Sequence, residues 1–142
     1  MALRSKRCAT DVARGRRLGE IRIAYILIET ARLRCEALAH EFSDDELLRR
    51  AHRDIGLAGY HVSNDFEAEL RERSLDEAYY RCAGPQHPQQ ALRAVLDDVL
   101  TACDALSYIV TDSGEPEIQT ARDYARAAAE RLNLALAGAA CR

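Results

Sequence analysis

The residues of this sequence best suited to proton transfer or metal binding are its 4 histidines and the carboxylates beside them. Helical proteins that bind two metal ions use Glu-x-x-His pairs, and no such pair occurs here. Glu36 and His40 are four residues apart, as are His61 and Asp65, so each pair shares one helix face. In an antiparallel hairpin that turns at residues 42–43, the rise of 1.5 Å per residue separates the two pairs by about 24 Å. We therefore expect neither a metal site nor a cofactor.

A second possible chemistry is phosphate transfer through a histidine. The residues from Leu38 to Phe42 read LAHEF. This stretch resembles the box around the phosphoacceptor of histidine-kinase dimerisation helices, which form hairpins that dimerise into four-helix bundles. The resemblance implies a phosphotransfer module with His40 as the phosphoacceptor and Glu41 assisting proton transfer. The sequence departs from that pattern because no proline follows and a capping motif begins three residues after His40. In the alternative, His40 simply complements the negative end of a helix dipole.

A third possible chemistry is RNA cleavage. Five residues separate Arg34 from His40, and five separate Arg81 from His87, a spacing similar to the Arg-His motif of the HEPN helical ribonucleases. That resemblance implies a histidine acting as general acid or base and an arginine holding the phosphate. A chain with 20 basic residues and 4 histidines gives such loose matches by chance. We therefore rank this function third.

Other catalytic motifs are missing from the sequence. It has no glycine-rich phosphate loop, no serine or cysteine nucleophile beside a base, and no dinucleotide-binding fingerprint. Its 5 cysteines include no Cys-x-x-Cys pair, which argues against a zinc site or a disulfide framework and favours the reducing cytoplasm. The sequence therefore favours a protein without enzymatic activity.

The element that would position His40 is a long apolar helix over residues 21–42. Its apolar residues recur at helical spacing, and four more lie outside that stripe: Ile23, Ile26, Leu27 and Leu33. A helix so apolar is buried on several sides, by its own chain or by a second copy. We predict that these four residues form an interface for self-association. The alternative is that they pack within the monomer under the third and fourth long helices.

The remaining sequence predicts partners for this helix. A Ser-x-x-Glu capping box at Ser43 and Glu46 begins a second helix. Its apolar stripe keeps phase past Gly56 and Gly59, which allow another helix to approach closely. The predicted helices are 18–42, 43–73, a short helix at 74–82 that begins with a second Ser-x-x-Glu, 88–110 and 115–137. We therefore expect an all-α fold, an antiparallel four-helix bundle made of two helical hairpins, with the short extra helix in the crossover.

Composition limits the remaining choices. The chain of 142 residues is 48% hydrophobic and 30% charged, which is typical of one globular domain. Residues 1–16 are basic and form an expected flexible arm, and residues 17–142 form the single domain. The arm has no aromatic residue, so nucleic acid is not favoured as a partner, and no apolar run reaches the length of a membrane span. We predict a cytoplasmic interaction or regulatory module that binds a second copy or another protein.

Overall fold

The computed structural model describes residues 2–64, 66–82, 84, 86–113 and 115–140. These residues form five α-helices, and no strand occurs among them. The prediction of an all-α protein is therefore confirmed. The helices, in chain order, are α1 (Ala2–Glu41), α2 (Glu46–Ser63), α3 (Ala68–Arg81), α4 (Pro88–Ser113) and α5 (Pro116–Ala140).

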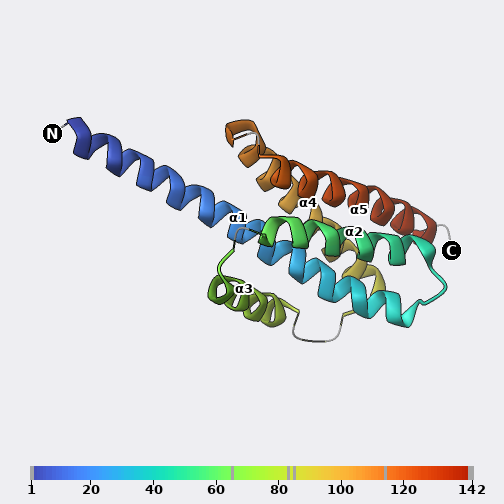
Figure 1. Ribbon diagram of the computed structural model, residues 1–142. Helices are drawn as coiled ribbons and strands as arrows, with labels where there is room; N and C mark the ends of the chain where they lie inside the picture. Colours follow the sequence, from blue (N-terminus) through green and yellow to red (C-terminus); the bar gives the residue numbers. More distant parts are fainter. Residues whose placement is uncertain (1, 65, 83, 85, 114, 141–142) are drawn as a thin grey trace.

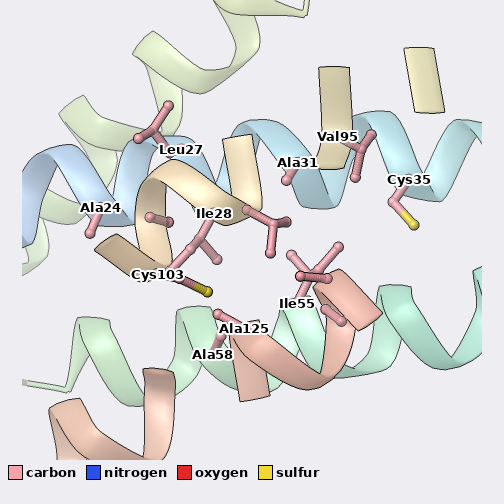
Figure 2. Close-up of a cluster of buried hydrophobic side chains, with 14 of the residues drawn as sticks. Ala24, Leu27, Ile28, Ala31, Cys35, Ile55, Ala58, Val95, Cys103 and Ala125 are labelled. Atoms are coloured by element: carbon pink, nitrogen blue, oxygen red, sulfur yellow. The ribbon is translucent and has the colours of Figure 1, made fainter. Parts of the chain in front are cut away.

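The four long helices surround one apolar core. α1 packs against α2 and α4, and α5 also packs against α2 and α4. Ile28, Ile55, Leu106 and Leu132, one from each long helix, are almost completely buried. Figure 2 shows Ile28 pointing toward the layer that contains Ile55, whereas Leu27 points to the opposite side of α1. One face of α1 therefore packs into the core. The second apolar face, which includes Leu27, lies on the other side of the helix.

α3 is the short helix outside the group of four long helices, and it packs against α1. Figure 1 shows it beside α1 and apart from α5. The predicted continuation of the second helix to residue 73 is wrong, because α2 ends at Ser63 and α3 begins at Ala68. Phe66, which kept the helical phase in the sequence, is buried in the connection with its ring edge-on to Tyr25, the ring centroids being 5.2 Å apart. Phe66 therefore has the spacing expected of a continuous helix although it lies in the turn between α2 and α3.

Both predicted capping boxes are also corrected by the structure. The N-cap of α2 is Asp45, whose carboxylate accepts a hydrogen bond from the Leu48 backbone N–H at 3.2 Å. Glu46 forms surface ion pairs within α2 and does not reach back to Ser43. Ser74 begins no helix, because it is buried inside α3 and its hydroxyl donates to a backbone carbonyl one turn earlier. Several neighbouring polar residues can cap a helix, so a short motif does not decide which one does.

Gly59 has the close-approach role that the sequence predicted, and Gly56 does not. A Cβ atom at Gly59 would lie 2.8 Å from Glu29 Oε1. A Cβ atom at Gly56 would have no neighbouring atom within 4 Å. Glu29 belongs to α1 and is buried, and its carboxylate accepts a hydrogen bond from Arg32 Nε at 2.6 Å. The glycine therefore makes room for a buried carboxylate between α1 and α2.

The first helix begins much earlier than predicted. α1 starts at Ala2, so the backbone of the basic segment continues the helix that was expected to begin at residue 18. Figure 1 shows this N-terminal part of α1 extending past the ends of the other helices. The flexibility expected for residues 1–16 stays a prediction.

Candidate functional site

The four predicted interface residues of α1 are divided between the surface and the interior. The side chain of Ile23 is 55% exposed, and that of Leu33 is half-buried. Ile26 and Leu27 are buried by this chain itself. Figure 2 shows Leu27 pointing toward α3, which explains how the second apolar face of α1 is covered. Part of the predicted interface is therefore internal packing, and Ile23 is its accessible part.

The projecting part of α1 leaves the other helices near Arg17. Arg17 forms an ion pair with Glu115, just before α5, and Arg22 lies 3.6 Å from Glu77 of α3. Between these two arginines, Leu18 is 49% exposed. Exposed Leu18 and Ile23 therefore lie where α1 emerges from the packed helices.

Arg34, Arg81 and Asp98 form an ion-pair cluster that joins α1, α3 and α4. Arg34 donates to Asp98 Oδ2 at 2.9 Å and to the Arg81 backbone carbonyl at 2.8 Å. Arg81 donates to Asp98 Oδ1 at 3.3 Å. These are the arginines of the two Arg-His spacings, and in the described part of the chain neither donates a hydrogen bond to a histidine. The structure thus places both guanidinium groups on one carboxylate.

The surroundings of this cluster make it a structural link. Burial raises the pKa of the Asp98 carboxyl above its usual range, and the guanidinium groups of Arg34 and Arg81 act in the opposite direction. Burial also raises the pKa of the Cys82 thiol, which donates to the Thr30 carbonyl at 3.5 Å. A protonated, hydrogen-bonded thiol is a poor nucleophile. The cluster holds the end of α3 against α1 and α4.

His40 and Glu41 lie in the last turn of α1, and both are exposed. Glu41 is at the edge of an open groove of about 730 Å³, formed where α1 ends, α2 begins, α4 begins and α5 ends. Apolar side chains line the groove, including Leu38, Phe42, Leu92 and Leu134. Four acids lie along the same site: Glu41, Asp44, Asp45 and Glu46. We call this the acidic groove.

Sequence reasoning missed the acidic groove. The sequence predicts only a helix-capping box at Ser43 and Glu46 in this segment. The local sequence carried a signal, a run of carboxylates next to an apolar side chain. The other wall comes from α4 and α5, distant in the sequence, and only the packing of the helices brings it there.

A contact between a histidine and a carboxylate joins α2 to α5. His61 Nδ1 lies 2.7 Å from Glu117 Oε2, and Asn64 Nδ2 donates to the same oxygen at 3.1 Å. The His61 ring stacks on Tyr124 with the centroids 5.7 Å apart. Hydrogen bonds from His61 and Asn64 hold the pKa of Glu117 below its usual range. No local pattern predicts this pair, because its members are 56 residues apart.

No set of three or more histidine, cysteine, aspartate and glutamate side chains among the described residues could hold a metal ion. The pair His61–Asp65 cannot be assessed as a unit, because Asp65 lies outside the described residues. No helix in the described part of the chain has an apolar stretch that could span a membrane.

The fold and these sites define an all-helical protein whose first helix extends beyond its packed helices. Comparison with protein-family models, with curated proteins and with solved structures found no match.

Proposed function

We propose that this protein is a non-enzymatic helical interaction module that self-associates through α1. The observation that carries the proposal is the extension of α1 beyond the helices that pack against it (Figure 1). Residues 2–16 span about 22 Å at 1.5 Å per residue. A helix of that length has marginal stability in water unless another surface packs against it. A second copy of the chain supplies such a surface.

The accessible apolar residues support association at the same place. Leu18 and Ile23 are exposed large apolar side chains within one and a half turns of each other on α1. Half-buried Leu33 extends the predicted interface, whereas Ile26 and Leu27 are covered within the chain. The proposed assembly is therefore a homodimer or larger homo-oligomer in which Ile23 and Leu18 become buried.

The proposed architecture of each copy is an antiparallel four-helix bundle with α3 beside it. The acidic groove supports this, because it joins the ends of α1 and α5 to the beginnings of α2 and α4. The contact between His61 and Glu117 joins the end of α2 to the beginning of α5 at the other end. The proposed compartment is the cytoplasm, since Cys35, Cys82 and Cys103 are free thiols.

The test is the mass of the full chain in solution, measured by light scattering during size-exclusion chromatography over a range of concentrations. We expect a mass above that of one chain. The double substitution Leu18→Glu with Ile23→Glu should lower the mass to that of a monomer, because burying two carboxylates in an apolar contact is unfavourable. Leu100→Glu, at an exposed leucine of α4, is the matched control and should leave the mass unchanged. A monomer at every concentration would overturn the proposal.

Phosphotransfer through His40 is the second candidate, and the exposure of the His40 side chain favours it. A phosphoacceptor must be reached by its donor, and Glu41 is exposed beside it. Incubation with phosphoramidate should then give an acid-labile phosphate on His40 that is lost in His40→Gln. Substitution of His52 by Gln is the control. Equal labelling of the wild type and His40→Gln would exclude this function.

A further inference from the structure

The acidic groove carries charge that the described residues do not fully neutralise. Asp45 caps α2, and Glu46 lies 3.3 Å from Arg49 and 3.2 Å from Arg50. Glu41 and Asp44 are exposed and form no ion pair with the described residues. No arginine or lysine is among the described residues that line the groove.

The position of Glu41 is itself unfavourable. It lies in the last turn of α1, where the helix dipole already places negative charge, and an acid there is destabilising. A bound cation or basic segment would offset that repulsion. The apolar floor, with Leu38, Leu92 and Leu134, suits a segment that also has apolar residues rather than a simple ion.

The same chain contains a segment of the complementary kind. Residues 2–16 include five basic residues and one acid, Asp11, together with several apolar residues. Their backbone is helical and extends away from the packed helices (Figure 1). Opposite charges on two surfaces guide their association and favour the correct partner.

This segment cannot reach the groove of its own chain. Both lie on the same continuous helix, and Arg16 is about 38 Å from Glu41 along α1 at 1.5 Å per residue. The groove can therefore receive this segment only from another molecule. From these observations we infer that the basic N-terminal segment of α1, residues 2–16, docks in the acidic groove of a second copy. The inference rests on the proposed self-association and adds a second contact to the one proposed at Leu18 and Ile23.

Crosslinking of the full chain tests the contact directly. Ser43 lines the groove and is exposed, and Cys8 is a native thiol of the basic segment. Mild oxidation of Ser43→Cys should give a disulfide between Cys8 of one copy and the introduced thiol of another, identified by mass mapping of peptides. Addition of Cys8→Ser should abolish it. Glu72→Cys, exposed on α3, is the positional control and should crosslink much more slowly.

Charge reversal gives an independent measurement by sedimentation. Glu41→Arg with Asp44→Arg should weaken association about tenfold, which corresponds to a few surface charge contacts made repulsive. Arg4→Glu with Arg7→Glu should weaken it similarly. Mixing the two reversed chains, or combining all four changes in one chain, should restore association. High salt should weaken the wild-type complex, because these charges lie at the surface.

The outcomes separate the two proposals. A wild-type chain that stays monomeric overturns both the self-association and the docking. A wild-type chain that associates, with no Cys8 crosslink and no response to charge reversal, overturns only the docking. If the doubly reversed groove variant loses its helical circular dichroism, the single substitution Ser43→Cys still decides the question.

Discussion

Substitution of Asp98 by Ala should destabilise the protein more than any surface ion-pair substitution. Asp98 holds Arg34 at 2.9 Å and Arg81 at 3.3 Å, and these three side chains are 12%, 18% and 46% exposed, in that order. Removing one partner of a buried ion pair costs about 3–5 kcal/mol. Because Asp98 and Arg34 keep some contact with water, we expect a loss of about 3 kcal/mol in the free energy of unfolding.

The contribution of Arg81 should be much smaller than that of Arg34. Arg81 is half exposed and its bond to Asp98 is longer, so Arg81→Met should cost less than about 1 kcal/mol. Arg34→Met should cost about 2–3 kcal/mol, because it leaves the buried carboxylate with one weak partner. A double-mutant cycle of Arg34 with Asp98 should give a coupling of about 2 kcal/mol.

The assay is urea unfolding followed by circular dichroism, combined with hydrogen exchange of the native protein. The cluster fixes the end of α3, since Arg34 also donates to the Arg81 carbonyl. Exchange in α3 should therefore rise in Asp98→Ala more than exchange in α2 or α5. A change in unfolding free energy below about 1 kcal/mol, with unchanged exchange in α3, would refute the reasoning.

Three further predictions concern other parts of the molecule. Burial raises the pKa of Cys35 to about 12 and that of Cys103 to about 11, so both thiols should resist Ellman's reagent in the native protein and react after unfolding; rapid reaction of either native thiol would contradict this. The pKa of Glu117 is lowered from 4.5 by folding, so its stabilising effect is complete above that pH and is lost as the pH falls through the folded pKa. Glu117→Gln should therefore weaken the pH dependence of the unfolding free energy below pH 4.5, and an unchanged profile would exclude the effect. Asp45→Ala should cost about 1 kcal/mol in a urea titration by removing the N-cap of α2, and Ser43→Ala, its control, should cost less.

The helical class and the positions of the long helices follow from local sequence patterns. The apolar spacing in residues 88–110 and 115–137 predicts α4 and α5 to within a few residues. Pro88 and Pro116 begin those helices, as the fixed backbone angle of proline favours. These signals are local, because the helical repeat of 3.6 residues places the apolar side chains on one face without reference to the rest of the chain.

The same local reasoning failed at the end of α2, where a tertiary contact has the spacing of a helical repeat. Phe66 kept the phase of a helix while packing in a turn against Tyr25. The backbone of residues 2–16 continues α1, and the flexibility expected for residues 1–16 stays a prediction. Of the four extra apolar residues on α1, Ile26 and Leu27 are buried within the chain, and the interface itself stays a prediction.

By itself the sequence determined that the chain is helical, that residues 21–42 form its most apolar segment, and that basic charge gathers near the beginning. Only the tertiary structure decided that Arg34 and Arg81 meet on Asp98, and that the acids following α1 face the ends of α4 and α5. The physical reason is the range of the interactions. Periodicity is fixed by neighbouring residues on one helix, whereas ion pairs between helices depend on how whole helices pack and on where the connections between them turn.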